Sequence, residues 1–183
     1  MYEMAKTAQG SSYIQACLRE HNVERFQAVC DEIIPHAAEL LLDAHGCYVV
    51  RTLMEQMARQ DLLALVKVIA KEEEVVFKLC TDSLHSRRII QFFLDILEPS
   101  ECEFLVDVMT KRCWDVSRTQ QGCIVLQRVL ECSAPDRKYQ IFEMVQRNIA
   151  AYSMDPYANY VVQYMFEMGD KDNNSQCVLN YFT

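Results

Sequence analysis

The chain has 183 residues, of which 51% are hydrophobic, and a formal net charge of −8 at pH 7. The hydrophobic share excludes an intrinsically disordered chain, and no apolar run reaches the roughly 18 residues that span a bilayer. Taken alone, the acidic charge argues against a nucleic-acid ligand, because phosphate contacts usually need a basic surface.

Five short segments share one pattern and recur at a nearly fixed spacing. Each has two polar or small positions, then two apolar residues, then Gln or Arg. In chain order the segments are Ser11–Gln15, Cys47–Arg51, Arg87–Gln91, Cys123–Gln127 and Asn159–Gln163. Their first residues are 36, 40, 36 and 36 positions apart. A fixed period in this range indicates a stack of similar helical units.

Each segment lies in a predicted helix with a recognisable start. A residue that can cap a helix N-terminus stands four positions before each segment, and Pro156 suits a first helical position. The capping residues are Thr7, Asp43, Ser83, Thr119 and Asp155. A small residue directly before each segment should let a neighbouring helix approach closely. These small residues are Gly10, Gly46, Ser86, Gly122 and Ala158. The predicted helices lie near residues 7–20, 43–57, 83–97, 119–132 and 155–168.

The remaining apolar-periodic segments predict further helices in each repeat. Longer helices are expected at 23–34, 62–70, 101–109 and 139–149, and short ones at 36–42 and, in part, 145–152. No short helix is expected before the first capped helix. Four additional residues between the second and third segments are assigned to a solvated turn at 71–74, where insertion has a low entropic cost. The pattern predicts an all-α solenoid that forms a single elongated domain over residues 1–183.

The ends and the cysteines add two expectations. Nine cysteines without a Cys-x-x-Cys pair are typical of reduced, buried thiols, which predicts an intracellular protein. A solenoid needs polar caps, but the chain lacks them and ends with an apolar segment at 177–182. We therefore expect self-association through the uncapped end faces.

The first, second and fifth residues of each segment, here called a triad, share one helix face, whereas the third and fourth point inward. No triad contains Asp or Glu. Two interpretations of this polar face remain open. A helical solenoid can bind a peptide on such a face. Alternatively, Asn and Gln can complement a base edge because each has a donor and an acceptor, and Tyr or Arg can stack on a base.

Two stretches carry a specific resemblance to a known family. Gln121–Cys132 and Asp155–Gln163 resemble successive repeats, the fifth and sixth, of the Pumilio-homology (PUF) family of RNA-binding proteins. The resemblance extends from Thr7 to about Asp170. It implies a right-handed α-solenoid of about five three-helix PUF repeats, similar to an armadillo superhelix, that binds single-stranded RNA at one base per repeat. Because the family's next repeat is absent, we expect a fragment or a divergent member.

The family's recognition rule, applied to matching positions, gives the firmest assignments to the last two triads. Asn159 and Gln163 would contact uracil, with Tyr160 stacking on the base. Cys123 and Gln127 would select adenine.

The three upstream triads match the rule more loosely. Cys47, Tyr48 and Arg51 form the combination associated with cytosine, with Tyr48 as the stacking residue. Ser11 and Gln15 fit adenine.

The triad that begins at residue 87 has no firm base preference. Gln91 would contact the base edge, and Arg88 would stack on the base. Arg87 stands where the family prefers Asn, Ser or Cys, and it would contact either a base or a phosphate. Ile124 and Ser12 replace planar residues in their triads. Because the family binds RNA antiparallel to its repeats, the predicted RNA core is 5′-U-A-N-C-A-3′.

The resemblance implies sequence-selective binding to messenger RNA 3′ untranslated regions, which controls translation or decay in the cytoplasm through regulatory proteins on the convex face. One alternative is a PUF-like protein that binds structured or ribosomal precursor RNA in the nucleolus with low sequence specificity. Another is an armadillo-like scaffold that binds proteins, which the acidic charge favours.

An enzyme is not expected. The histidines, His21, His36, His45 and His85, lack metal-ligand spacing, and the sequence has no nucleophile elbow, phosphate loop or paired catalytic carboxylates. His45 and His85 recur two residues before a triad, which indicates a structural repeat position. The sequence predicts no catalytic residue, no cofactor and no metal site.

Overall fold

The structure, a computed structural model, describes residues 1–20 and 22–168, so the apolar segment 177–182 lies outside the described residues. Every regular element in these ranges is a helix, which confirms the all-α prediction. None of the described helices is both long and apolar enough to span a bilayer. The residues form two compact units, and the single domain expected over 1–183 stays a prediction. Of the described residues, the first unit contains 1–20, 22–79 and 84–92, and the second contains 80–83 and 93–168.

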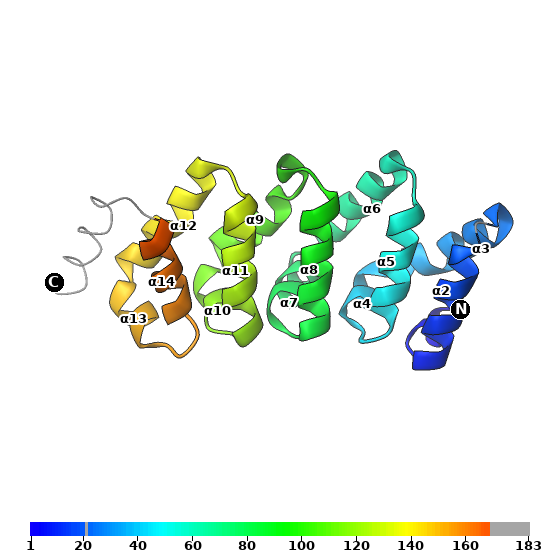
Figure 1. Ribbon diagram of the computed structural model, residues 1–183, viewed down its shortest axis with the longest axis horizontal. Coiled ribbons are helices and arrows are strands. Elements are labelled where there is room, and N and C mark those ends of the chain that lie inside the picture. The colour runs from blue at the N-terminus through cyan, green and yellow to red at the C-terminus, as the bar shows by residue number, and fades with distance from the viewer. Residues whose placement is uncertain (21, 169–183) are drawn as a thin grey trace. The chain divides into compact units, whose positions relative to one another are not determined.

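In the first unit, a short helix, a triad helix and a third helix follow one another along the chain (Figure 1). The triad helices α2 and α5 lie side by side. The elements are α1 (Tyr2–Ala5), α2 (Ala8–Arg19), α3 (Val23–Ile33), the 3-10 helix η1 (Ile34–His36), α4 (Ala37–Leu42), α5 (Gly46–Gln56), α6 (Arg59–Lys71), most of α7 (Glu73–Thr81) and the start of α8 (Leu84–Ile96).

The second unit has the same order of helices, and its triad helices α11 and α14 are in contact. The third helices α9 and α12 also pack together. After the ends of α7 and α8, the elements are the 3-10 helix η2 (Pro99–Glu101), α9 (Glu103–Lys111), α10 (Cys113–Ser117), α11 (Gln120–Cys132), α12 (Pro135–Arg147), α13 (Ile149–Met154) and α14 (Asn159–Met168).

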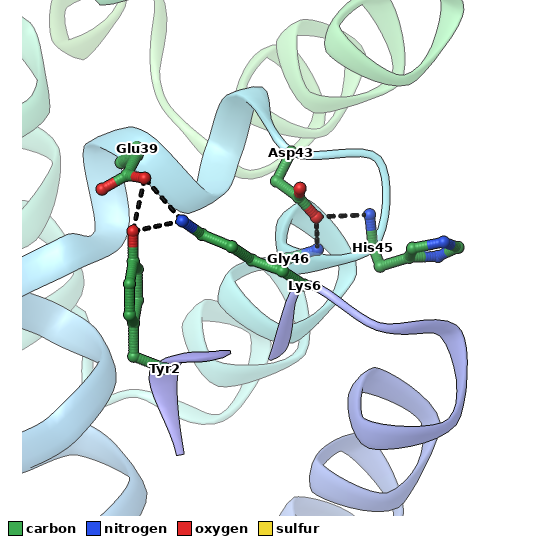
Figure 2. Close-up of polar contacts among 6 residues, drawn as sticks. All are labelled: Tyr2, Lys6, Glu39, Asp43, His45 and Gly46. Carbon is green, nitrogen blue, oxygen red and sulfur yellow. Dashed lines mark hydrogen bonds and ion pairs between the residues drawn. The ribbon is translucent and has the colours of Figure 1, made fainter. Parts of the chain in front are cut away.

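The expectation that no short helix precedes the first triad helix is wrong, because α1 occupies that place. Figure 2 shows how α1 is joined to α4: Lys6 Nζ donates to Glu39 Oε1 at 2.6 Å, and the Tyr2 hydroxyl donates to the same carboxylate and accepts from Lys6. The hydrogen bond to Glu39 is the main cause that raises the pKa of the Lys6 ammonium. A four-residue helix is too short to show a periodic pattern.

Four of the five predicted caps are of two kinds in the structure. Thr7 and Thr119 are N-caps whose Oγ1 atoms accept from the amides of the third residue on, at 3.1 and 2.9 Å. Asp43 instead forms a turn, in which Oδ1 accepts from the amides of His45 and Gly46 at 2.9 and 2.7 Å (Figure 2). Asp155 forms the same turn. Helices α5 and α14 therefore begin later than predicted, and Pro156 lies in a turn, outside the first helical position.

Three of the small residues before the triads, all of them glycines, lie against the preceding short helix. A Cβ atom built on Gly10 would lie 2.2 Å from the Met4 carbonyl oxygen of α1, and one on Gly122 would lie 2.1 Å from the Val116 carbonyl oxygen of α10. At Gly46, the nearest atom is a side-chain methyl of Leu40 on α4, at 2.7 Å. The close helix approach expected at the small residues is thus confirmed at these three glycines.

We expect Gly122→Ala to lower the free energy of unfolding by about 2 kcal/mol, because the added methyl forces the α10 backbone away. Helix propensity alone would act in the opposite direction, favouring Ala by about 1 kcal/mol. Urea unfolding followed by circular dichroism measures the change. Gln120→Ala, at an exposed position of the same first turn, is the control and should change stability by less than about 0.5 kcal/mol. A Gly122→Ala variant that is more stable than the wild type would contradict the packing explanation.

The apolar pair at the third and fourth segment positions is buried in each unit, with one exception. Tyr13 is 63% exposed, although Val49, at the same place in the second segment, is fully buried. Tyr13 lies beside Met4 and Cys17 on the edge of an open cavity of about 240 Å³. The inward orientation is thus confirmed for every residue of these pairs except Tyr13.

The additional residues of this repeat mainly lengthen helix α7, so their assignment to a solvated turn at 71–74 is wrong. Helix α7 has nine residues, whereas the corresponding α13 has six, and only Glu72 separates α6 from α7. Glu73 and Glu74 occupy the first turn of α7. Acidic side chains are stabilising there because the helix N-terminus carries partial positive charge.

Candidate nucleic-acid interface

The three triad positions differ in exposure. The first position is buried where it is small: Ser11, Cys47 and Cys123 are at most 3% exposed, whereas Arg87 and Asn159 are half-buried. The second position is half-buried at Tyr48 and exposed in the other triads. These exposed residues are Ser12, Arg88, Ile124 and Tyr160. The fifth position is exposed at Gln163 and half-buried in the other triads, at Gln15, Arg51, Gln91 and Gln127. Planar groups and amides therefore dominate the accessible triad surface of each unit.

The triad of α2 is engaged in hydrogen bonds within the first unit. Gln15 Nε2 donates to Ser11 Oγ at 3.0 Å, and Ser11 Oγ donates to the His45 carbonyl oxygen at 2.8 Å. Gln15 Oε1 accepts from Thr52 Oγ1 of α5 and from Arg19, each at 3.5 Å. A base that is recognised here must replace bonds that the protein already makes.

Arg51 of α5 has its guanidinium fixed from two sides. Its Nε donates to Glu55 Oε1 at 2.9 Å, and its Cζ lies 5.0 Å from the centroid of the Phe92 ring. These contacts hold the plane of a group that can donate several hydrogen bonds. Burial raises the pKa of the neighbouring Cys47 thiol to about 11, so that triad position is neutral at pH 7.

The second-position residues of α5 and α8 touch each other. Arg88 Nη1 donates to the Tyr48 hydroxyl at 3.2 Å, and that hydroxyl lies 3.1 Å from His85 Nδ1. The Tyr48 and His85 rings are perpendicular, with centroids 6.0 Å apart. Two planar groups expected to stack on bases thus meet within the first unit.

In the second unit, α14 carries an amide pair. Gln163 Nε2 donates to Asn159 Oδ1 at 3.1 Å, and Asn159 Nδ2 donates to the Asp155 carbonyl oxygen at 2.8 Å. The ring of Tyr160, which follows Asn159 on the helix, is 50% exposed. The side-chain amides of Asn159 and Gln163 are thus held together by a hydrogen bond, and the Tyr160 ring is accessible.

The triad of α11 is joined to that of α14. Gln127 Nε2 donates to the Tyr160 carbonyl oxygen at 3.1 Å, and Cys123 Sγ donates to the Gln120 carbonyl oxygen at 3.5 Å. The second position holds Ile124, which is 43% exposed and cannot stack as a planar group does.

The triad residues of the second unit carry no charge, and nearby charges are paired. Arg128, directly after Gln127, has Nη1 2.5 Å from Glu131 Oε2. Although burial acts against ionisation, amide hydrogen bonds from Ala158 and Tyr157 and the guanidinium of Arg118 hold the pKa of the Asp155 carboxyl below its usual value. The exposed triad surface of the second unit is therefore neutral.

Several residues that contact the triads were missed in the sequence. They are Thr52 beside Gln15, Glu55 and Phe92 beside Arg51, and His85 beside Tyr48. Among these residues, only His85 was marked in the sequence, because a histidine stands two residues before a triad in two repeats. The structure places His85 against the preceding triad.

Comparison with known proteins supports the repeat assignment. A family model for the Pumilio-family RNA binding repeat matches residues 1–34, 36–70, 112–145 and 148–180. These ranges contain the triads that begin at 11, 47, 123 and 159.

Two curated relatives match almost the whole chain. The chain is 25% identical to a Pumilio domain-containing protein of Schizosaccharomyces pombe, over 97% of this chain and 31% of that protein. It is 23% identical to Pumilio homolog 12 of Arabidopsis thaliana, over 92% of this chain and 34% of that protein. The chain thus spans about a third of the length of these relatives.

Solved structures share the fold. The Puf4 RNA-binding domain bound to an HO endonuclease RNA 3′ UTR recognition sequence is 26% identical, with a TM-score of 0.76 over 96% of this chain and 55% of that chain. Yeast Puf5p bound to AAT2 RNA is 18% identical, with a TM-score of 0.80 over 99% of this chain and 50% of that chain. Because the repeat model matches well over half of its residues, the chain belongs to the Pumilio family of RNA-binding repeat proteins.

Proposed function

We propose that the chain binds single-stranded RNA sequence-selectively, with each triad contacting one base. The observation that carries this proposal is the hydrogen-bonded amide pair of Asn159 and Gln163 beside the exposed ring of Tyr160. An amide pair can complement a base edge, and an aromatic ring adds about 1–3 kcal/mol by stacking. The RNA bound to Puf4 and Puf5p in their solved structures supports the same class of ligand here.

The base assignments follow the triads. Asn159 and Gln163 take uracil, and Cys123 and Gln127 take the adenine that follows it. In the first unit, the fixed guanidinium of Arg51 supports cytosine, because its donors suit the acceptors of the cytosine edge. The proposed RNA is 5′-U-A-N-C-A-3′, and the adenine assigned to the α2 triad contributes least because Ser12 has no planar group to stack on it.

We place the biological role in messenger RNA. A recognition sequence in a 3′ untranslated region is the ligand of Puf4 in its solved structure. On this proposal, the chain would select similar messages and control their translation or decay by bringing regulatory proteins to them.

A second candidate function, binding of RNA with low sequence specificity, is favoured by Ile124 and Ser12. Neither side chain can stack as a planar group, so two triads lack part of the recognition set. In this case the chain would bind many single strands with similar affinity.

Fluorescence anisotropy with end-labelled RNA distinguishes the two functions. We expect 5′-U-A-N-C-A-3′ to bind at least about tenfold more tightly than the same strand with its U-A changed to C-C. Because the second-unit triads are uncharged, this ratio should persist when the salt concentration is raised. Equal affinity for both strands would support the low-specificity function, and no binding to either would exclude both.

Restoring a planar group at position 124 should strengthen binding. We expect Ile124→Tyr to raise affinity for 5′-U-A-N-C-A-3′ about fivefold, since an exposed ring would then stack on a base. Anisotropy titration measures the gain, and Ile124→Val serves as the control that adds no ring. If Tyr and Val give the same affinity, residue 124 does not face a bound base.

A further inference from the structure

His85 stands two residues before the triad of α8, yet its side chain contacts the triad of α5. Its Nδ1 lies 3.1 Å from the Tyr48 hydroxyl oxygen. The same relation between consecutive repeats occurs one repeat earlier, where Ser11 Oγ of α2 donates to the carbonyl oxygen of His45. In both repeats, the residue two positions before a triad therefore contacts the preceding triad. His85 contacts the second residue of that triad, and His45 contacts the first.

The Tyr48 hydroxyl is bonded to both Arg88 and His85. Arg88 can only donate, so the Tyr48 oxygen accepts from Arg88 Nη1. We assign the Tyr48 O–H as the donor to His85 Nδ1, which corresponds to the imidazole tautomer that is protonated on Nε2. The two rings are perpendicular, with an interplanar angle of 88°. The imidazole meets the hydroxyl end of Tyr48 and does not lie flat on its ring.

We propose that His85 is a positioning residue for RNA recognition, which orients the ring of Tyr48 for stacking on a base. This inference rests on the proposed function. When a base stacks on Tyr48, Arg88 gives up its bond to the hydroxyl and becomes available to the RNA. The bond to His85 remains and keeps the Tyr48 ring in place.

The residues at the same position in the other repeats provide a variant that distinguishes a positioning role of His85 from a structural one. The residues that correspond to His85 are Gln9, His45, Gln121 and Tyr157. Glutamine is thus compatible with this helix start, and its side-chain oxygen can accept from the Tyr48 hydroxyl as Nδ1 does. His45 follows a repeat whose second position is Ser12, which has no ring to orient.

Anisotropy titration of the full chain with 5′-U-A-N-C-A-3′ tests the proposal. We expect His85→Ala to weaken binding about fivefold, the effect of losing one hydrogen bond, and His85→Gln to stay within about twofold of the wild type. His45→Ala is the matched control and should bind as the wild type does. Circular dichroism melts show whether each variant is folded.

Two further titrations exclude a general structural effect. In a Tyr48→Phe background, His85→Ala should cause no additional loss, because the hydroxyl is already gone. With an abasic nucleotide in place of the cytosine, His85→Ala and the wild type should bind equally.

The contrary outcomes are distinct. Unchanged binding by His85→Ala, or equal losses for His85→Ala and His85→Gln, would overturn the positioning role while RNA binding stands. A wild type that binds no RNA would overturn the proposed function and this inference with it.

Discussion

Replacing Asn159 by Ser and Gln163 by Glu is expected to change the base preferred by the last triad from uracil to guanine. Uracil presents a donor between two acceptors, which the hydrogen-bonded amides of Asn159 and Gln163 can match. Guanine presents two adjacent donors, and a carboxylate accepts both. A good two-bond contact discriminates by about 1–3 kcal/mol, so affinity for the guanine strand should rise about tenfold and affinity for the uracil strand should fall about tenfold.

Competition titrations with RNAs that differ only at this base measure the change. Gln140→Glu, an exposed position on α12, adds the same charge away from the triads and is the control for general repulsion of RNA. If the double variant loses affinity for all four bases equally, Asn159 and Gln163 do not contact a base edge.

Loss of the Tyr160 ring should weaken binding whatever base is present. We expect Tyr160→Ala to cost about 1–3 kcal/mol, or roughly fivefold to 150-fold in affinity, because every base can stack on an aromatic face. The hydrogen bond from Gln127 to residue 160 uses the backbone carbonyl and survives the substitution. Anisotropy titration against strands with uracil, cytosine and guanine at this position measures the loss.

Tyr139→Ala is a closely matched control for this experiment. Tyr139 on α12 is 54% exposed, against 50% for Tyr160, but lies outside the triads. Its removal should leave RNA affinity unchanged. Equal losses in the two variants, or a loss in neither, would show that Tyr160 does not stack on RNA.

The repeat pattern predicted the helices well because each repeat carries its own local signals. Thr7 and Thr119 cap their helices by accepting hydrogen bonds from amides three residues further along the chain. Gly122 packs against α10, the helix that directly precedes its own helix. Asp43 and Asp155 were equally plausible caps, but an Asp side chain can also close a turn before the helix begins.

What the sequence did not predict depends on contacts between repeats. Tyr13 occupies a position that is aliphatic in the other segments, yet only packing decides that its ring is exposed. The contacts of Gln15 with Thr52 and of Tyr48 with His85 join residues 37 positions apart. Such pairs have no local signature, because each depends on the register of one repeat against the next.

Selection of RNA from a pool of randomised single strands tests most directly whether the triads recognise bases. We expect enrichment of 5′-U-A followed one nucleotide later by C-A, with U and A the most constrained positions. The same selection with the Asn159→Ser, Gln163→Glu variant should replace that U by G and leave the other positions unchanged. Enrichment without a U-A preference, or the same sequences from both proteins, would contradict base recognition by the triads.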